Sequence, residues 1–553
     1  MIRRSVSAAL LMAGLACSGN GAGQARDAGS DMASASGGAS SSGGLTGTGT
    51  GGAATGGSGA GASAGAGGAG GASTTSGQGG AGGGTATAGT GGGAAGAGGH
   101  AGGGAGGHAG AAGAAGSAGA GGHTTNGSGG CGCICAGTCV GTGGNGGAGG
   151  AANPVLHVTY AQPYPASQIA LIGMLIDVDS QDRAVVIGPR APSDNIDPGP
   201  AMLLIPRSGT PTKTEFAGAV TPEAMAIDAS DNVWMVGQLY RSVTFGGSTA
   251  APVDNGYYLA KLGPTGTPLL TKSIATTDFT HLRSVTTDSA GNLYVVGSRS
   301  DLVMNLSRVF VTKFSTSGTQ IFDHEYPSTD SQAEATDVAI TPDGTVVITG
   351  FYVGQLAFGT TTLTSRAELY NGFVAWLSAT DGDPTRAQSF GGTIFDFANS
   401  IQVTAAGTIR IGGRLSGSSM IGGATATGDV KGSPFVAELT STGMANWVRV
   451  LDGIGIVFQG DTNDAARTFE VGRIEGTTTD SFVASVGADG IVSQLLRTNT
   501  GTSGNGTVFA AADRHGGVWV AGEFAGSADF GTGPLAGGAG SPATTNYLLH
   551  LEP

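Results

Sequence analysis

The stretch IDASDNVWMVG, residues 227–237, contains the pattern that decides the fold. Ile227 ends an apolar segment, a polar turn begins at Asp228, and Val-Trp-Met-Val then leads to Gly237. β-Branched and aromatic residues bounded by Asp, Asn and Gly are typical of strands joined by a tight turn. The stretch therefore predicts a β-hairpin.

The same hairpin recurs along the chain, which favours a repeat architecture. Further copies end at Gly188, Gly297, Gly350, Gly413, Gly472 and Gly522. Nine residues before each final glycine stands a short polar side chain that can start a turn by bonding to a nearby backbone N–H. These candidate turn residues are Asp179, Asp228, Asp288, Thr341, Thr404, Asn463 and Asp513. We expect a positive φ three residues later, at Asp182, Asp231, Gly291, Gly344, Gly407, Ala466 and Gly516.

A second column of apolar strands occurs in every copy. Its members are AMLLI (201–205), YLAKL (258–262), FVTKF (310–314), FVAWL (373–377), FVAEL (435–439), FVASV (482–486) and YLLHL (547–551). Most are followed by a Gly-containing turn and a further extended segment. Each unit thus supplies four antiparallel strands without helical periodicity. Seven such units predict an all-β fold, a seven-bladed β-propeller of four-stranded blades, over residues 153–553.

The last unit lacks a fourth strand, because the chain stops at Pro553 soon after its third. VLHVTY, residues 155–160, precedes the first unit and has the character of a fourth strand. We therefore predict that this N-terminal strand completes the last blade and closes the ring.

Three glycine-containing segments suggest a family. VTFGG (243–247), LAFGTTTL (356–363) and ADFGTGPLAGGAG (528–540) each lead to a third strand. They resemble the seven-bladed propeller repeats of bacterial surface lipoproteins, of the myxobacterial type with Gly-rich stalks. The resemblance implies a fold and a cell-surface location but no catalytic residue. The fifth and sixth copies depart most from the pattern, since Arg410 and Glu470 interrupt their strands.

Residues 1–16 have the features of an export signal: two arginines, then an apolar run too short to span a bilayer. The following Cys17 resembles the lipid-attachment cysteine of bacterial lipoproteins, which implies an anchor in the outer membrane or at the cell surface. Gly14 departs from that pattern, because leucine usually stands three residues before the cysteine. The alternative is ordinary cleavage after Ala16 and secretion.

Residues 17–152 are rich in Gly, Ala, Ser and Thr, with too little apolar surface to offset the entropy of ordering them. We predict a disordered tether. Its four cysteines, Cys131, Cys133, Cys135 and Cys139, favour two short disulfides in an exported chain. A metal site with His100, His108 or His123 is the alternative, although the spacing fits zinc poorly.

Composition narrows the function classes. A net charge of −14 with scattered basic residues argues against nucleic-acid binding. No G-x-S-x-G, H-E-x-x-H or P-loop motif occurs. Neighbouring acids such as Asp228 with Asp231, or Asp381 with Asp383, would permit weak calcium binding. Thr and Asn share the turn column, however, so turn formation is favoured there and no cofactor is expected.

The sequence therefore favours a lipid-anchored module, with a monomeric propeller, that binds or scaffolds through protein or glycan contacts. The alternative is an extracellular hydrolase or lyase that acts on a polymer. Loops 189–200, 299–308 and 363–372 differ most between copies and are the candidate contact loops. We expect His550 to be partly buried on a strand and His515 to be solvated in a turn.

Overall fold

A computed structural model describes residues 156–553 apart from 165–174, 190–198, 209, 219–221, 240, 254, 302, 331, 367–368, 393, 464–466, 476–478, 499–507, 526, 531–532 and 537–543. The described residues belong to one compact unit, and a second unit, Asn20–Cys131, lies outside them. The predicted export signal, tether, Cys17 and cysteine cluster 131–139 also lie outside the described residues. No helix capable of crossing a membrane occurs in the described part of the chain.

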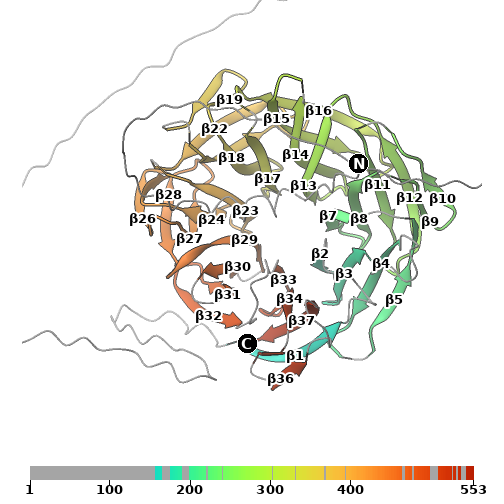
Figure 1. Ribbon diagram of the computed structural model, residues 1–553. Coiled ribbons are helices and arrows are strands. Elements are labelled where there is room, and N and C mark those ends of the chain that lie inside the picture. Colours follow the sequence, from blue (N-terminus) through green and yellow to red (C-terminus); the bar gives the residue numbers. More distant parts are fainter. Residues whose placement is uncertain are drawn as a thin grey trace, which may run out of the picture. The chain divides into compact units, whose positions relative to one another are not determined.

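Seven four-stranded antiparallel sheets are arranged as the blades of a propeller, which confirms the predicted fold class (Figure 1). Blade 1 consists of β2 (Leu175–Val178), β3 (Ala184–Pro189), β4 (Pro200–Ile205) and β5 (Thr212–Glu215). Blade 2 consists of β7 (Pro222–Ile227), β8 (Val233–Gln238), β11 (Tyr257–Leu262) and β12 (Pro268–Ile274). Blade 3 consists of β13 (Phe279–Thr287), β14 (Leu293–Asp301), β15 (Leu306–Phe314) and β16 (Gln320–Pro327). Blade 4 consists of β17 (Ala333–Ile340), β18 (Val346–Tyr352), β21 (Asn371–Leu377) and β22 (Pro384–Phe390). Blade 5 consists of β23 (Phe397–Val403), β24 (Ile409–Leu415), β27 (Ser433–Leu439) and β28 (Ala445–Val450). Blade 6 consists of β29 (Ile454–Thr462), β30 (Thr468–Glu475), β31 (Thr479–Val486) and β32 (Val492–Thr498). Blade 7 consists of β33 (Phe509–Ala512), β34 (Val518–Ala525), β37 (Thr544–Glu552) and β1 (His157–Tyr164).

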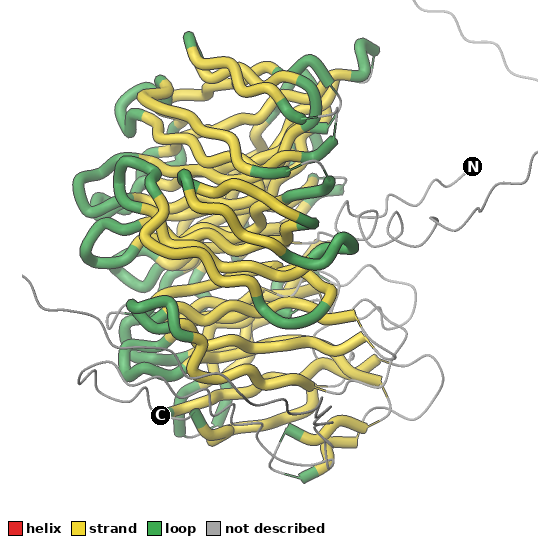
Figure 2. Tube along the Cα trace, turned by 90° about the vertical axis from the view of Figure 1, so that its left-hand side faces the viewer, coloured by secondary structure: helices red, strands yellow, loops and turns green. Residues whose placement is uncertain are grey.

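The first strand of each blade contacts the first strands of both neighbouring blades, so these strands form the inner wall of the ring. Seen from the side, the strands run between two faces on which turns and loops gather (Figure 2). We call the face with the turns between first and second strands the turn face, and the opposite one the loop face.

The ring is closed by the N-terminal strand, as predicted. β1 pairs with β37 from His157 opposite Glu552 to Tyr164 opposite Asn546. The strand extends to Tyr164, beyond the predicted end at Tyr160. Pro163 is compatible with this extension because β1 is the outer edge of its blade, where a missing N–H breaks no ladder.

The core lies between adjacent blades. The middle strands of a blade are buried throughout, as in β8 and β11, so they appear in the sequence as continuous apolar runs. The outer strands, such as β12, are partly exposed. One apolar cluster joins blades 3 and 4 and another joins blades 4 and 5, so neighbouring blades stabilise each other through shared layers.

Four blades carry an extra hairpin between their second and third strands. These hairpins are β9 (Val243–Phe245) with β10 (Ser248–Ala250), β19 (Gln355–Phe358) with β20 (Thr361–Thr364), β25 (Ser418–Ile421) with β26 (Ala424–Thr427), and β35 (Ser527–Asp529) with β36 (Pro534–Ala536); the short strand β6 (Ala217–Gly218) extends the first. Phe245, Phe358 and Phe530 of the segments quoted above are buried. The prediction of four strands per unit missed these hairpins, because strands of three or four residues beside glycine turns resemble loops in sequence.

The turn between the third and fourth strands of blade 6 packs on the outer strand of blade 5. Gly490 in this turn has a φ of +73°, and a Cβ there would lie 2.6 Å from Cδ2 of Trp447. Gly344 in a turn of blade 4 has a φ of +87°, but nothing lies within 4 Å of a Cβ built on it. Both glycines therefore meet the same backbone requirement, and packing distinguishes them.

We expect Gly490→Ala to lower the free energy of unfolding by about 3 kcal/mol, since backbone strain and overpacking add. Gly344→Ala should cost only about 1 to 2 kcal/mol, from backbone strain alone. Chemical denaturation of both variants measures the difference, and equal losses would contradict the close packing at Gly490.

Candidate functional site

The candidate turn residues all begin the turn between the first and second strands of a blade. In every blade the backbone N–H of this residue donates to the carbonyl four positions later, as from Asp228 to Asn232 at 2.9 Å. The Oδ1 of Asp228 also accepts from the N–H groups of Ser230 and Asn232, at 2.9 and 3.0 Å. Positive φ occurs three residues later at Asp182, Asp231, Gly291, Gly344, Gly407 and Gly516, while Ala466 lies outside the described residues.

The oxygens of these turn residues mostly accept from backbone amides, which gives the column a structural role. Among the residues that the structure describes, no group of three or more His, Cys, Asp or Glu side chains is arranged to hold a metal ion.

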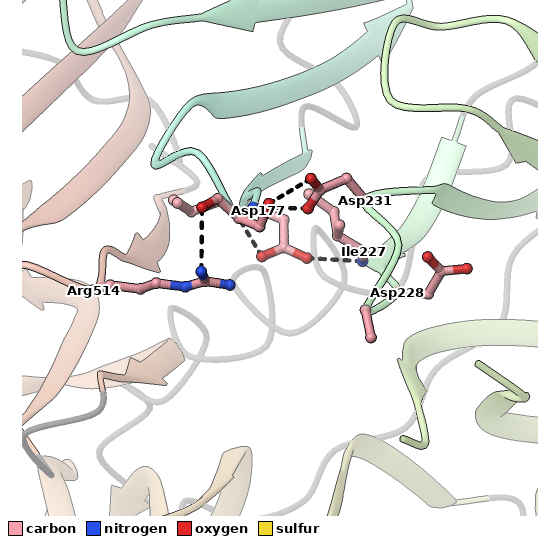
Figure 3. A pocket seen from close by; sticks show the side chains of 8 residues that line it. Asp177, Ile227, Asp228, Asp231 and Arg514 are labelled. Atoms are coloured by element: carbon pink, nitrogen blue, oxygen red, sulfur yellow. Dashed lines mark hydrogen bonds between the residues drawn. The ribbon is translucent and has the colours of Figure 1, made fainter. Parts of the chain in front are cut away.

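A polar cavity of about 190 Å³, here called the turn pocket, lies among the turns of blades 1, 2 and 7 (Figure 3). Ser180 donates to both carboxylate oxygens of Asp231, from its backbone N–H at 2.8 Å and its hydroxyl at 2.6 Å. The guanidinium of Arg514 donates to the carbonyl of Ser180 at 3.2 Å. These contacts link three neighbouring turns, so the polar groups of the turn pocket are used within the protein.

His515 is solvated, with its side chain 60% exposed, and lies 3.0 Å from a carboxylate oxygen of Asp182. Asp182 also accepts from the backbone N–H of Arg514 at 3.1 Å. Asp182 and Asp231 occupy positions where glycine is the easier choice, and their carboxylates connect blade 7 to blade 1 and blade 1 to blade 2.

Three aspartates on first strands cap backbone groups of the next blade. Asp177 accepts from the N–H of Ile227 at 3.0 Å. In the same way Asp337 accepts from Ile401 and Asp461 from Ala512, both at 2.8 Å. The inner edge of a first strand has no partner strand, so these carboxylates satisfy N–H groups that would otherwise remain unpaired.

These carboxylates hold protons more tightly than they would in water. Desolvation raises the pKa of Asp177 to about 7 and those of Asp337 and Asp461 to about 6, and repulsion from Asp461 adds to the shift of the other two. Asp228 behaves differently. Burial raises its pKa, but hydrogen bonds from Lys261 and Asn232 outweigh burial and hold the pKa below its ordinary value.

The sign of the resulting pH dependence follows from proton binding. The folded state binds more protons than the unfolded state at Asp177, Asp337 and Asp461, so their contribution to stability is lost as pH rises from about 4 to 7. Asp228 contributes above pH 4 and loses its contribution on acidification. We expect maximal stability near pH 4. Urea denaturation across pH 4 to 8 measures this, and Asp461→Asn should flatten the decline between about pH 4 and 6.

A Thr-His-Asp relay lies in blade 7. The Nε2 of His550 is 2.7 Å from Oδ2 of Asp513, and its Nδ1 is 3.2 Å from the hydroxyl of Thr159. The connectivity resembles that of a nucleophile, a base and an acid. His550 is buried, however, and its ring stacks on Trp519 at a centroid distance of 4.2 Å.

Blades 2 and 3 show what this arrangement does. Lys261 occupies the position of His550, lies 2.9 Å from the turn residue Asp228 and sits over the ring of Trp234. In blade 3 the Nζ of Lys313 lies 3.5 Å from Oδ2 of the turn residue Asp288 and sits over the ring of Tyr294. Because a lysine replaces the histidine without any hydroxyl partner being needed, the relay is a structural contact between a turn and a third strand.

The two residues that interrupt the strand pattern are buried in blades 5 and 6. Arg410 is completely buried and its Nε lies 3.0 Å from Oε2 of Glu438. Glu470 accepts from the hydroxyl of Ser400 at 3.1 Å, and burial raises its pKa to about 8. Gly460 leaves room for the Glu470 carboxyl, since a Cβ there would lie 2.3 Å from Oε2. Both blades are complete, and the polar residues are accommodated by their neighbours.

The structure describes the three predicted contact loops to different extents and places them in different surroundings. Loop 189–200 lies mostly outside the described residues. Loop 299–308 is the tip of the β14–β15 hairpin and exposes Val303 and Met304. Loop 363–372 follows β20 and lines a cavity of about 330 Å³ beside the end of β22, which we call the rim pocket. Its wall consists of Thr364, Arg366, Asn371, Gln388, Ser389, Phe390, Gly391, Met420, Gly422, Gly423, Gly443 and Met444.

Comparisons with known proteins give this chain only distant matches, all of them to solved structures. No protein-family model and no curated protein matches it. Among solved structures, a streptogramin B lyase matches at 11% identity over 70% of this chain and 97% of its own, with a TM-score of 0.38. The Pan2 WD40 domain of Neurospora crassa matches at 12% identity over 69% and 88%, with a TM-score of 0.38. YCF48 bound to D1 peptide matches at 8% identity over 71% and 96%, with a TM-score of 0.36. Such low identities say nothing about activity.

Proposed function

We propose that this chain is a lipid-anchored cell-surface binding protein whose propeller takes its ligand at the rim pocket. The anchor rests on the sequence around Cys17 and on the resemblance to surface lipoproteins with propeller repeats. The binding role rests on the rim pocket, where one of the variable loops lines a cavity. At about 330 Å³ this cavity is within the size range of small-molecule sites.

The observation that carries the proposal is the exposed Arg366 in the lining of the rim pocket. No hydrogen bond or ion pair to its guanidinium is found among the described residues, although its backbone N–H donates to Asn371 at 3.3 Å. By contrast, the turn pocket uses its polar groups internally, and its Arg514 donates to a carbonyl. An exposed cation that shares a cavity with the exposed Met420 and Met444 gives an acidic protein a place where an anionic or amphipathic ligand can bind, which favours the rim pocket.

A binding screen tests the proposal. The full chain is applied to a glycan array and used in pull-downs of surface proteins, beside variants Met420→Trp and Met444→Trp that fill the rim pocket. Both side chains are exposed, so these variants should fold. The matched control is Met304→Trp, at the exposed tip of loop 299–308. Binding that survives both pocket-filling variants, or no binding at all, would contradict the proposal.

The anchor has its own test. We expect Cys17→Ser to release the protein from membranes while the propeller keeps its melting temperature, because a lipid on Cys17 would be the attachment. Membrane fractionation with mass spectrometry of the N-terminal peptide measures this. A membrane-bound Cys17→Ser protein would rule the anchor out.

A further inference from the structure

Blades 5 and 6 meet in a buried layer that contains polar groups. The layer lies between β23 and β24 of blade 5 and β29 and β30 of blade 6, and we call it the blade 5–6 seam. Glu470 of β30 is completely buried and reaches across the seam, where its Oε2 accepts from the hydroxyl of Ser400 at 3.1 Å. Its Oε1 is also buried and has no hydrogen-bond partner among the described residues. One oxygen of this carboxyl group therefore remains unpaired inside the protein.

An unpaired amide faces this carboxyl group. Gln402 of β23 is 6% exposed, and neither its Nε2 nor its Oε1 has a partner among the residues that the structure describes. A Cβ built on Gly460 of β29 would meet Oε2 of Glu470 and would lie 2.6 Å from Nε2 of Gln402. Both side chains thus end beside the same point of the seam, where the glycine leaves them room.

The hydrogen-bonding capacities of the two groups decide which form of Glu470 fits. The amide of Gln402 has donors on Nε2 and an acceptor in Oε1. An ionised carboxylate only accepts and would leave Oε1 of Gln402 unsatisfied, whereas a neutral carboxyl group both donates and accepts. Terminal carboxyl and amide torsions are soft, so the two groups can rotate into this pairing. Because a buried polar atom without a partner destabilises the fold, the pairing favours the protonated acid.

Burial and the surrounding charges favour the same form. Burial raises the pKa of Glu470 to about 8, and repulsion from Asp337 of β17 and Asp461 of β29 adds to this shift. Arg410 of β24 attracts a negative charge at this position, but its guanidinium is engaged by Glu438 of β27, with Nε 3.0 Å from Oε2. Glu470 is therefore a neutral acid at pH 7.

We propose that Glu470 is a proton-dependent lock between blades 5 and 6. As a neutral acid it donates its carboxyl hydrogen to Oε1 of Gln402 and so joins the two blades. When the proton leaves to water, the carboxylate loses this bond and lies in a buried layer whose arginine is already paired, so the seam opens locally. The lock acts whether or not the rim pocket binds a ligand.

The proton sets the direction of the response. Because the closed seam holds the proton more tightly than the open one, the contribution of Glu470 to stability is complete below about pH 4.5 and is lost as pH rises to about 8. The pKa values of Asp337 and Asp461 are about 6, so the interval from pH 7 to 8 isolates Glu470 within the seam. We expect the equilibrium constant for opening to rise about fivefold from pH 7 to 8 and only about twofold from pH 8 to 9.

Hydrogen–deuterium exchange of the full chain between pH 6 and 9 measures this opening, after correction for the intrinsic pH dependence of amide exchange. The reporter strands are β29 and β30 of the seam. β18 in the middle of blade 4 reports opening of the whole propeller. We expect the protection of β29 and β30 to fall about fivefold from pH 7 to 8, while that of β18 stays unchanged.

Variants identify the titrating group. Glu470→Gln keeps the shape of the neutral acid and cannot ionise, so it should remove the fall in protection while the protein stays folded. Ser400→Ala removes a hydroxyl that stabilises the ionised form, and should move the end of the fall to higher pH. The matched control is Asp489→Asn, which removes an exposed carboxylate of the same blade and should leave the response unchanged. Thermal melting at pH 6 shows whether each variant is folded.

The possible outcomes are distinct. A fall in protection that persists in Glu470→Gln would assign the proton to another group and overturn the lock. An equal fall in β18 would overturn it too, since the whole propeller and not one seam would then open. Unchanged protection of β29 and β30 from pH 7 to 8 would show that the seam stays closed. This last measurement uses the unaltered chain, so it decides the question even if a variant folds poorly.

Discussion

Deletion of β1, residues 157–164, should destroy the cooperative unfolding of the propeller. The deletion removes the whole outer strand of blade 7 and leaves the edge of β37 unpaired. It also removes the packing of Tyr160 against Trp519, at a centroid distance of 5.5 Å, and the Thr159 contact with His550. With about 1 kcal/mol for each lost ladder hydrogen bond, the cost is roughly 5 kcal/mol or more, comparable with the stability of a typical domain.

Calorimetry of the full chain and the deletion variant measures this effect. We expect aggregation or a broad transition at much lower temperature, because an exposed strand edge also promotes association. The control removes residues 26–125, which contribute no described residue to the propeller, and its melting temperature should equal that of the full chain. A deletion of β1 that melts like the full chain would contradict closure of the ring by this strand.

Arg410→Ala should lower the free energy of unfolding by about 3 to 5 kcal/mol, because it leaves the buried carboxylate of Glu438 without its cation. Arg410 also donates to the carbonyl of Gly487 at 3.4 Å, so blade 6 loses a contact with blade 5. Chemical denaturation at neutral pH measures the loss.

Two comparisons sharpen the result for Arg410. Lys213 and Glu215 form an exposed pair at 2.8 Å, so Lys213→Ala should cost less than about 1 kcal/mol. The double variant Arg410→Met with Glu438→Leu should recover much of the loss, since an apolar pair has no charge to compensate. An Arg410→Ala variant as stable as Lys213→Ala would show that the buried pair of Arg410 and Glu438 contributes no more to stability than an exposed pair.

The fold could be predicted from the sequence because each blade repeats the same local chemistry. Asp228 and its counterparts specify a turn through contacts within five residues, so a single copy is informative and seven copies remove the ambiguity. Ring closure was also predictable, since the strand missing after Leu551 has a matching spare before the first unit.

Features that depend on contacts between blades could not be predicted. Asp337 and Asp461 are ordinary acidic residues in sequence, and their capping role appears only when the inner edges of two blades meet. Arg410 and Glu470 looked like interruptions because their partners Glu438 and Ser400 are distant in sequence. The Phe-Gly pairs that begin at Phe245 and Phe358 indicated a recurring element, but the strands that contain these phenylalanines are too short to be recognised from the sequence.

The rim pocket is lined in part by one of the predicted contact loops, whose contact role stays a prediction. Loop 363–372 stood out by its variability, and Arg366 lies within it. Its other wall, which includes Met420 and Met444, comes from the next blade, and the absence of a described partner for the guanidinium is a property of the folded chain. Sequence variability indicated where to look but not the chemistry found there.

Hydrogen–deuterium exchange of the full chain, with and without a ligand identified by the glycan array or the pull-downs, tests the central claim most directly. We expect slower exchange in residues 361–372, 386–392 and 418–427, the segments of blades 4 and 5 around the rim pocket, and no change at the turns of blades 1, 2 and 7. Protection at residues 179–183 and 228–232, with none in blades 4 and 5, would contradict it.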